Sequence, residues 1–207
     1  MNPVISAYKK IAPNYEDILG SIYEFAPLPI DGFFAGLAKG SKVLDAGCGP
    51  GFESAVGARH GHAMTGLDAC EEMLARFRIN VPSGRSLLSA VTKIPADTGT
   101  FDAVFSSCVL LHLPRAEAIS ALRELCRVLK PEGKFLLVTS VSKGEEEHYS
   151  KPELTAAGVE NLYFHNWEMN DLLRNVAEAG FQIESSEVLT IKPQRPSLIF
   201  IFGRKST

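Results

Sequence analysis

The stretch Val43–Gly51, VLDAGCGPG, constrains the fold of this chain more than any other. It is an apolar run that ends in an acid, Asp45, and continues with glycines at positions 47, 49 and 51. Helical character returns from Phe52 onward, so the pattern predicts a buried strand, a tight loop and the start of a helix. Glycines tolerate positive φ angles and let a ligand approach the backbone closely. We therefore expect the loop to bind a ligand, with its amide groups holding negative charge and Asp45 favouring a cationic or donor-rich neighbour.

The spacing of these glycines differs from that of two common nucleotide-binding motifs. The dinucleotide fingerprint G-x-G-x-x-G would need a glycine where Phe52 stands, and the chain has no G-x-x-x-x-G-K-[ST] phosphate loop. The segment Leu44–Gly51 instead resembles the first motif of class I S-adenosylmethionine-dependent methyltransferases. The resemblance implies that the loop wraps the amino-acid end of S-adenosyl-L-methionine, with S-adenosyl-L-homocysteine as the product.

Length and composition are those of one ordinary globular domain. The chain has 207 residues, 45% of them apolar and 22% charged, with a formal net charge of −3. This charge gives no reason to expect nucleic-acid binding, and the four cysteines contain no C-x-x-C pair that would suggest a zinc site. The N-terminus lacks a signal-peptide pattern, and no apolar run approaches the ~20 residues of a membrane span. We expect a cytoplasmic protein without metal or membrane segment, as a monomer or homodimer.

A second strand that ends in an acid follows the glycine loop. Residues 63–68 form this predicted strand, and Asp68 at its end could accept hydrogen bonds from both hydroxyls of a ribose. Asp68 could also cap the helix that begins near Cys70, and the two roles are compatible. We favour ribose binding because the glycine loop lies directly upstream.

The resemblance also implies residues for the adenine end of the cofactor. In the family, the residue after this acid and a methionine of the next helix flank the adenine, and here these are Ala69 and Met73. The family often has an adenine-binding aspartate on the third strand, where this chain has Ala90. This departure leaves a backbone contact around Ala90 and Val91 as the expected interaction.

The segment Phe101–Leu113 resembles the fourth motif of the same family. Ligands of parallel α/β sheets lie at the carboxyl ends of the strands, so Ser106, Ser107 and Cys108 are expected near the transferable methyl group. His112 is the candidate general base, because the ordinary pKa of histidine, ~6.5, suits proton removal. In the family a histidine at this place more often braces the loop by hydrogen bonds.

Apolar and aromatic residues recur at helical spacing through residues 2–24. The spacing predicts one or two amphipathic helices, interrupted near Pro13–Asn14. The segment resembles the N-terminal cover of small-molecule methyltransferases, which implies contacts from Tyr15 to the cofactor and from Tyr8 to the acceptor. A packing helix whose tyrosines only fill space is equally compatible. Prolines break the pattern further on, and a short helix capped by Asp31 is expected to follow.

Residues 141–166 lack periodicity, and loops at this place in the fold commonly determine specificity. The aromatic cluster around Tyr163 and Trp167 could form a wall for a planar or apolar acceptor, and His165 could reach the same pocket. The cluster could equally anchor the next helix. Residues 181–190 and 197–202 then form two strands without an intervening helix, so they must pair antiparallel.

We predict a single α/β domain over residues 1–207, a Rossmann-like three-layer α/β/α sandwich with a seven-stranded, mostly parallel sheet that includes a C-terminal antiparallel strand. Its expected parts are a helical cover (1–40), a cofactor-binding core (41–140), an acceptor-pocket segment (141–167), and a helix with the strand pair (168–207). The resemblance, which covers residues 42–139, implies methyl transfer from S-adenosyl-L-methionine to a small-molecule acceptor by in-line displacement. The residues expected to bind the cofactor are Tyr15, Asp45, Ala46, Gly47, Cys48, Gly49, Gly51, Asp68, Ala69, Met73, Ala90, Val91, Ser106 and Ser107. The residues expected to contact the acceptor are Tyr8, Cys108, Tyr163, His165 and Trp167.

Three alternatives remain open at this point. The chain could methylate protein or RNA, although its net charge and the absence of an Asn/Asp-Pro-Pro-Tyr-like motif at residues 106–109 argue against this. It could bind the cofactor without catalysis, which the alanine at position 90 favours. It could also be a nicotinamide-dependent reductase, which Phe52 in the loop and the C-terminal strand pair disfavour.

Overall fold

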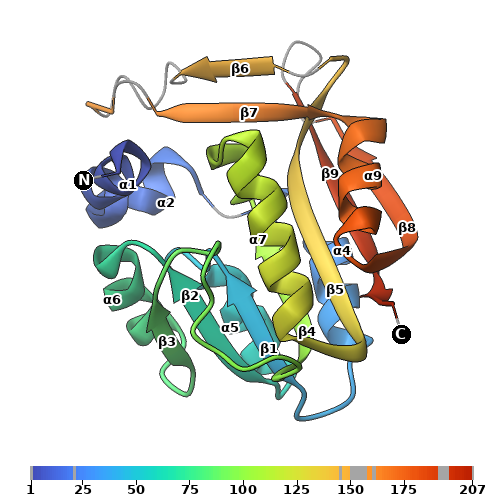
Figure 1. Cartoon of the computed structure of the whole chain (residues 1–207). Helices are drawn as coiled ribbons and strands as arrows, with labels where there is room; N and C mark the ends of the chain where they lie inside the picture. The colour runs from blue at the N-terminus through green and yellow to red at the C-terminus, as the bar shows by residue number, and fades with distance from the viewer. Residues whose placement is uncertain are drawn as a thin grey trace.

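The computed structural model describes residues 2–20, 22–144, 146–149, 158–159, 162–190 and 196–206, and it contains a twisted sheet with helices on both faces (Figure 1). Five strands run parallel in the order β3-β2-β1-β4-β5. Their bounds are β1 Lys42–Ala46, β2 Ala63–Asp68, β3 Arg85–Leu88, β4 Phe101–Ser107 and β5 Leu129–Ser142. Because the strands are parallel, their carboxyl ends meet at one edge of the sheet.

The C-terminal strands complete the sheet as the sequence predicts. Strand β9 (Ser197–Lys205) pairs antiparallel with β5, and β8 (Phe181–Leu189) pairs antiparallel with β9. Together with the five parallel strands, they form the predicted seven-stranded, Rossmann-like sheet.

A further pair of strands was not predicted from the sequence. Strands β6 (Glu146–Tyr149) and β7 (Tyr163–Glu168) pair antiparallel, and β7 continues parallel to the end of β5 through Val141 and Ser142. The described part of the chain therefore has nine strands. In Figure 1, β6 and β7 cross the top of the molecule, above α1 and α7. Much of the predicted acceptor-pocket segment, namely residues 145, 150–157 and 160–161, lies outside the described residues.

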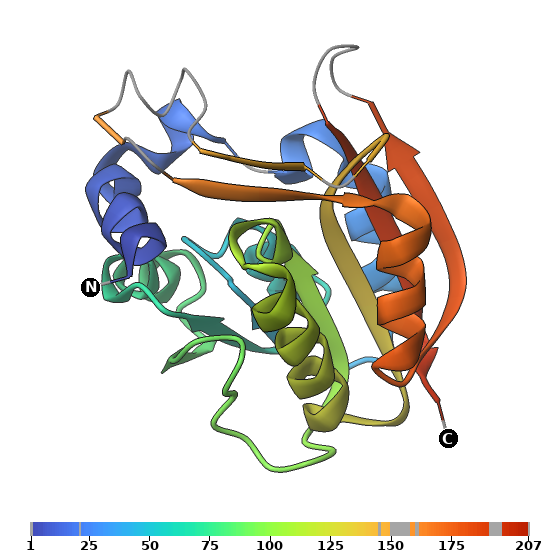
Figure 2. The same cartoon turned by 45° about the horizontal axis from the view of Figure 1, so that its top comes forward.

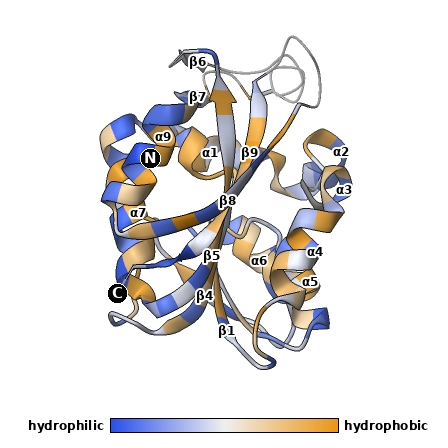
Figure 3. Ribbon diagram, turned by 90° about the vertical axis from the view of Figure 1, so that its right-hand side faces the viewer, coloured by the Kyte–Doolittle hydropathy of each residue, from blue (hydrophilic) through white to orange (hydrophobic). Residues whose placement is uncertain are grey.

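Helices cover the two faces of the sheet, as Figure 3 shows with the sheet seen edge-on. Successive strand residues alternate between the two faces: Leu44 packs with the α7 and α9 side, and Val43 with the α4, α5 and α6 side. The helix bounds are α4 Pro27–Ala35, α5 Phe52–Arg59, α6 Glu71–Asn80, α7 Arg115–Val128 and α9 Met169–Glu178.

The N-terminal cover lies over the carboxyl edge of the sheet and packs beside α6 (Figure 2). It consists of α1 (Pro3–Ile11), the 3₁₀ turn η1 (Ala12–Asn14), α2 (Tyr15–Ile18) and α3 (Ile22–Phe25), so the predicted interruption at residues 13–14 is confirmed. Lys9 of α1 forms an ion pair with Glu72 of α6 at 2.6 Å. Arg76 of α6 donates to the carbonyl oxygen of Ala12. These contacts hold the cover against the cofactor-binding core predicted from the sequence.

The expected helix capped by Asp31 has to be corrected. Helix α4 begins at Pro27, because proline suits the first turn of a helix, where its missing N–H has no partner to lose. Asp31 therefore lies inside the helix, where its carboxylate contacts His60 Nε2 at 2.9 Å.

The described residues include no helix with the length and hydropathy to cross a bilayer. Within the same ranges, His, Cys, Asp and Glu side chains form no cluster that could hold a metal ion.

Candidate functional site

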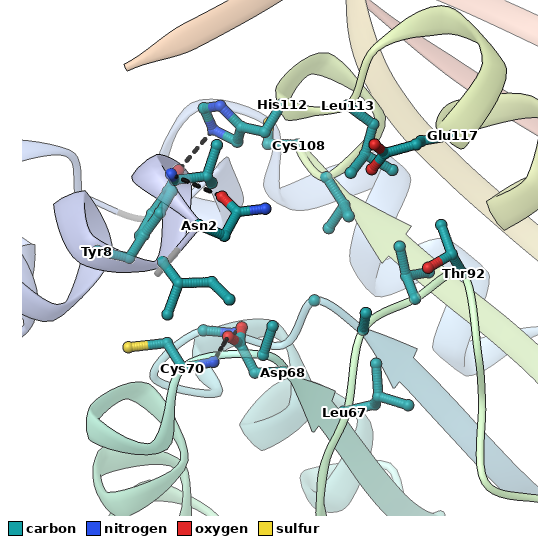
Figure 4. A pocket seen from close by; sticks show the side chains of 18 of the residues that line it. Asn2, Tyr8, Leu67, Asp68, Cys70, Thr92, Cys108, His112, Leu113 and Glu117 are labelled. Atoms are coloured by element: carbon teal, nitrogen blue, oxygen red, sulfur yellow. Dashed lines mark hydrogen bonds between the residues drawn. The ribbon is translucent and has the colours of Figure 1, made fainter. Parts of the chain in front are cut away.

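A cavity of about 590 Å³ opens at the carboxyl edge of the parallel strands, beneath α1 (Figure 4). Its walls come from the loops after β1, β2, β3 and β4, from α1 and α2, and from the first residue of β7. The volume lies within the ~300–1,000 Å³ range of pockets that hold one small ligand. This is the place where a doubly wound sheet binds its ligands.

Glycine stands at each of the three positions of the first loop for a different structural reason. Their φ angles are +78° at Gly47, +50° at Gly49 and +86° at Gly51. A Cβ atom on Gly47 would lie 1.9 Å from Cγ2 of Val109, and one on Gly51 would lie 2.6 Å from Cδ2 of Phe77. A Cβ atom on Gly49 would meet no atom within 4 Å. Gly47 and Gly49 line the cavity, whereas Gly51 allows close packing against α6.

Four amide groups of this loop already donate within the chain, and the negative charge that one of them holds is the Asp68 carboxylate. The amides of Gly47 and Cys48 donate to the carbonyl oxygen of Leu67 at 2.6 and 3.0 Å. The amide of Gly51 donates to the carbonyl of Cys48 at 2.9 Å, and that of Gly49 to Asp68 Oδ2 at 2.9 Å. Three of these four amides bond to the end of β2, so the loop is fixed to that strand.

The position of Asp68 is compatible with both roles left open by the sequence. One carboxylate oxygen accepts from the Gly49 amide, and the other accepts from the Cys70 amide at 2.8 Å, just before α6. The side chain also lines the cavity. Burial raises the pKa of Asp68, and the backbone hydrogen bonds oppose this shift. The acid therefore fixes the first loop to the start of α6 while facing the ligand space.

Asp45 lies behind the loop. Its side chain is buried and accepts a hydrogen bond from Ser54 Oγ of α5 at 2.7 Å. Burial raises the pKa of Asp45 to about 8, and the Ser54 hydroxyl partly offsets this. The sequence predicted a cationic or donor-rich group beside Asp45, and the structure has one hydroxyl donor there, that of Ser54.

Several other residues expected at the cofactor support the cavity without lining it. Ser106 Oγ donates to the carbonyl oxygen of Ala46 at 2.9 Å and ties β4 to β1. Met73 is fully buried beneath α1. The predicted cofactor residues outside the cavity wall are Asp45, Ala46, Cys48, Gly51, Met73 and Ser106, and those in the wall are Tyr15, Gly47, Gly49, Asp68, Ala69, Ala90, Val91 and Ser107.

The end of β4 presents a buried polar atom and a strained residue to the cavity. Ser107 Oγ is buried and has no hydrogen-bond partner among the described residues. Cys108 has a φ angle of +56°, which is uncommon for a residue other than glycine. Its amide donates to the carbonyl of Val138 at 2.8 Å, which helps to hold this conformation. Strained backbone of this kind concentrates at functional sites.

Tyr8 and His112 come from two distant parts of the chain and contact each other in the cavity wall. The Tyr8 hydroxyl lies 2.6 Å from His112 Nε2, and His112 Nδ1 lies 3.0 Å from the carbonyl oxygen of Tyr163. His112 belongs to the 3₁₀ turn η2 (Leu110–His112), which follows β4. Both ring nitrogens are engaged, so the bracing role expected for this histidine is present in the structure.

Two of the residues expected at the acceptor have to be corrected. Tyr8, Cys108 and Tyr163 line the cavity, but His165 and Trp167 are fully buried and do not. The two rings lie 4.6 Å apart on β7, and Arg115 Cζ lies 5.2 Å from the centre of the Trp167 ring. Trp167 packs into the core between the sheet and α9. This agrees with the alternative in which the aromatic cluster anchors the next helix.

Sequence reasoning missed the apolar and acidic part of the cavity wall. Val4 and Ile5 of α1 and Leu113 after η2 line it, and Glu117 of α7 stands exposed at its margin. The helical spacing of the N-terminal apolar residues is a signal for a buried face. It does not reveal that part of this face borders a cavity.

Comparison with known proteins agrees with this geometry. Residues 44–137 match the methyltransferase-domain family. The matched segment contains the glycine loop, Asp68 and His112, and it runs from β1 to β5. Over residues 44–137 the chain belongs to the methyltransferase-domain family.

The chain is 35% identical over 120 residues to an uncharacterised methyltransferase of Synechocystis sp., a match that covers 58% of the chain and 56% of the relative. It is 30% identical over 138 residues to a tRNA U34 carboxymethyltransferase of Trichlorobacter lovleyi, which covers 60% of the chain and 40% of the relative. The chain thus spans about half the length of these curated relatives.

A solved structure extends the similarity to the whole fold of this chain. The 1,6-didemethyltoxoflavin-N1-methyltransferase of Burkholderia thailandensis, with bound 1,6-didemethyltoxoflavin and S-adenosylhomocysteine, has a TM-score of 0.80 to this chain at 18% identity. The similarity covers 99% of this chain and 88% of that one. At this identity the similarity shows the fold alone.

Proposed function

We propose that the protein transfers the sulfonium methyl group of S-adenosyl-L-methionine to a small-molecule acceptor, and that both bind in the cavity beneath α1. The observation that carries the proposal is the composition of the cavity wall. Gly47, Gly49, Asp68 and Ser107 line one ligand space together with Tyr8 and His112, and Figure 4 shows Asp68 on the side of this space that faces His112.

The residues present fit the cofactor. Gly49 leaves open the space that a side chain would fill, and the Ser107 hydroxyl is a buried polar group that a ligand can satisfy. Asp68 places a carboxylate beside the ligand, and each of its oxygens keeps a lone pair beyond the one its backbone amide uses. The cofactor has two positive groups and one negative group, so a wall that includes this acid suits its net charge. We assign the ribose to Asp68 and the adenine to the wall formed by Ala69 and the segment Ala90–Val91.

Methyl transfer from this cofactor requires the protein mainly to position the acceptor and the methyl group. The bound cofactor supplies a methyl group that is already activated for transfer. The chain's own residues then have to hold the acceptor within ~3–3.5 Å of that carbon and exclude water. Helix α1, tied to α6 by the Lys9–Glu72 ion pair and to η2 by the Tyr8–His112 hydrogen bond, covers the cavity and serves both purposes.

The cavity favours a small acceptor over a nucleic acid. Its wall beneath α1 includes the apolar side chains Val4, Ile5 and Leu113, and the chain has a formal net charge of −3. Phosphate-rich acceptors are normally bound by basic surfaces. A tRNA acceptor, as in the name of one relative, is the second candidate, and binding without catalysis is the third.

Calorimetric titration with S-adenosylhomocysteine and with NAD tests the cofactor assignment. We expect saturable binding of S-adenosylhomocysteine alone, and binding of NAD alone would refute the proposal. Gly49→Ala should weaken this binding by about tenfold or more. The matched control is Gly61→Ala, because Gly61 also has a positive φ, +85°, and open space at its Cβ but lies outside the cavity wall.

Transfer of labelled methyl groups then separates an enzyme from a binder. Purified protein with labelled S-adenosyl-L-methionine is offered a small-molecule extract and, separately, total tRNA. We expect label in the small-molecule fraction. Label in tRNA alone would favour the second candidate, and label in neither fraction despite cofactor binding would favour the third.

A further inference from the structure

The Tyr8–His112–Tyr163 contacts define where protons lie at the acceptor side of the cavity. The Tyr163 carbonyl can only accept, so a neutral His112 carries its proton on Nδ1. Nε2 then bears the lone pair and accepts from the Tyr8 hydroxyl at 2.6 Å. The ring has no nitrogen left for direct contact with an acceptor, but the Tyr8 oxygen still has lone pairs beside the cavity that it lines.

The surroundings of Tyr8 keep its hydroxyl protonated. Burial raises the pKa of Tyr8 well above its ordinary value, and the nearby Tyr15, Cys108 and Asp68 raise it further. Tyr8 therefore does not act as a standing phenolate base. It can take a proton only while it passes its own proton to His112, and the Tyr163 carbonyl stabilises the imidazolium that results.

We propose that Tyr8 relays a proton from the acceptor to His112, and that the acceptor is accordingly an uncharged molecule that is methylated on a phenol- or enol-type hydroxyl group. This inference rests on the proposed function. The acceptor O–H bond breaks as its proton passes to Tyr8 Oη, and Tyr8 gives its own proton to His112 Nε2. The electron pair left on the acceptor oxygen forms the bond to the methyl carbon while the carbon–sulfur bond breaks. The products are the methyl ether, S-adenosylhomocysteine and a protonated His112, which returns its proton to solvent.

The chemistry of the wall limits the acceptor in three ways. An amine acceptor already offers a lone pair, so a buried proton route suits a hydroxyl group, which has to lose its proton as it reacts. Acceptors with a carboxylate or phosphate would meet the acids Asp68 and Glu117, which line the same cavity. The apolar side chains Val4, Ile5 and Leu113 favour a mostly apolar body on the acceptor.

The relay can be tested without knowing the natural acceptor. Protein saturated with S-adenosylhomocysteine is titrated with phenol, benzylamine and benzoate, which share one ring and differ in their polar group. We expect phenol to bind more tightly than the other two. Tighter binding of benzoate or benzylamine, or no saturable binding of phenol, would overturn the inference.

A second probe, 4-nitrophenol, reports the proton directly, because its ionised form absorbs visible light. At mildly acidic pH we expect the bound probe to ionise more than the free one, so its apparent pKa falls on binding. Tyr8→Phe should abolish this shift and weaken binding by about two- to tenfold, the effect of one lost hydrogen bond. A wild-type complex in which the pKa of the probe is unchanged or raised would refute the relay.

A matched variant separates the relay from the covering role of α1. Lys9→Gln removes the exposed ion pair to Glu72 from the same helix and leaves the cavity wall intact. We expect it to keep the shift in the pKa of 4-nitrophenol, and loss of the shift in Lys9→Gln would show that α1 merely closes the cavity. Failure of S-adenosylhomocysteine to bind would count against the proposed function, whereas normal binding without the shift would count against the relay alone.

Discussion

Gly47→Ala tests the reason for the first glycine of the loop. Gly47 combines a φ angle of +78° with a Cβ position 1.9 Å from Cγ2 of Val109. The substitution therefore adds backbone strain and a steric clash at once. Val109→Ala removes the clashing atom but leaves the strain, so the two substitutions together separate the two costs.

The expected free energies follow from these two terms. A side chain at a left-handed φ angle costs roughly 1–2 kcal/mol. Overpacking costs about 1–3 kcal/mol, so Gly47→Ala should destabilise the fold by ~2–5 kcal/mol. Val109→Ala alone should cost about 1 kcal/mol, because the side chain is only half-buried. The double variant should lose only ~2–3 kcal/mol, which is ~1–3 kcal/mol less than the sum of the single changes.

Urea unfolding followed by circular dichroism gives the free energy of unfolding of each variant. Gly61→Ala is the control for backbone strain alone, because Gly61 has a φ angle of +85° and open space at its Cβ position. We expect it to cost about 1–2 kcal/mol. If the costs of Gly47→Ala and Val109→Ala add within ~0.5 kcal/mol, the clash with Val109 is not the reason for the glycine.

Three further substitutions follow from the burial and hydrogen bonds of single side chains. Asp68→Ala should weaken S-adenosylhomocysteine binding by about 1–3 kcal/mol in calorimetry and also lower stability, since two backbone amides lose their acceptor; lower stability with unchanged affinity would leave the acid a cap only. Asp45 has a folded-state pKa raised from 3.8 to about 8, so the folded protein holds a proton that the unfolded chain releases, and stability falls as pH rises between these values. Asp45→Asn should make the free energy of unfolding, measured with urea across this pH range, depend less on pH, so that the variant gains several kcal/mol relative to the wild type near the upper end. A parallel decline of stability in both proteins would contradict the raised pKa of Asp45. Trp167→Ala should cost ~3–5 kcal/mol in thermal unfolding while the folded variant binds S-adenosylhomocysteine normally, whereas a selective loss of cofactor binding would place the ring at the site after all.

The candidate site could be predicted from the sequence where it depends on short segments. The loop at residues 47–51 and Asp68 are recognisable because the loop follows β1 directly and Asp68 is the last residue of β2, and both strands end at the same edge. The alternatives for Asp68 could not be separated, because capping and ligand contact use the same residue at the same position. The structure gives it both contacts: two backbone amides and the cavity.

The roles of His112 and Trp167 depended on partners far away in the chain. His112 is engaged by Tyr8, 104 positions earlier, and no local pattern indicates that pair. An aromatic cluster around Trp167 is compatible with a pocket or a core until its neighbours are known. Its burial against the sheet and α9 decides for the core.

The amino-acid sequence by itself determined the alternation of strands and helices from β1 to β5, the antiparallel C-terminal strand pair, and the glycine loop at the ends of the strands, but not β6 and β7. These features follow from hydrophobic periodicity and from backbone preferences, which act over a few residues. Tertiary structure decided that the loop amides bond to β2, that β6 and β7 pair above the cavity, and that Tyr8 meets His112. Each of these contacts joins separate segments, and its geometry exists only once the sheet has brought them together.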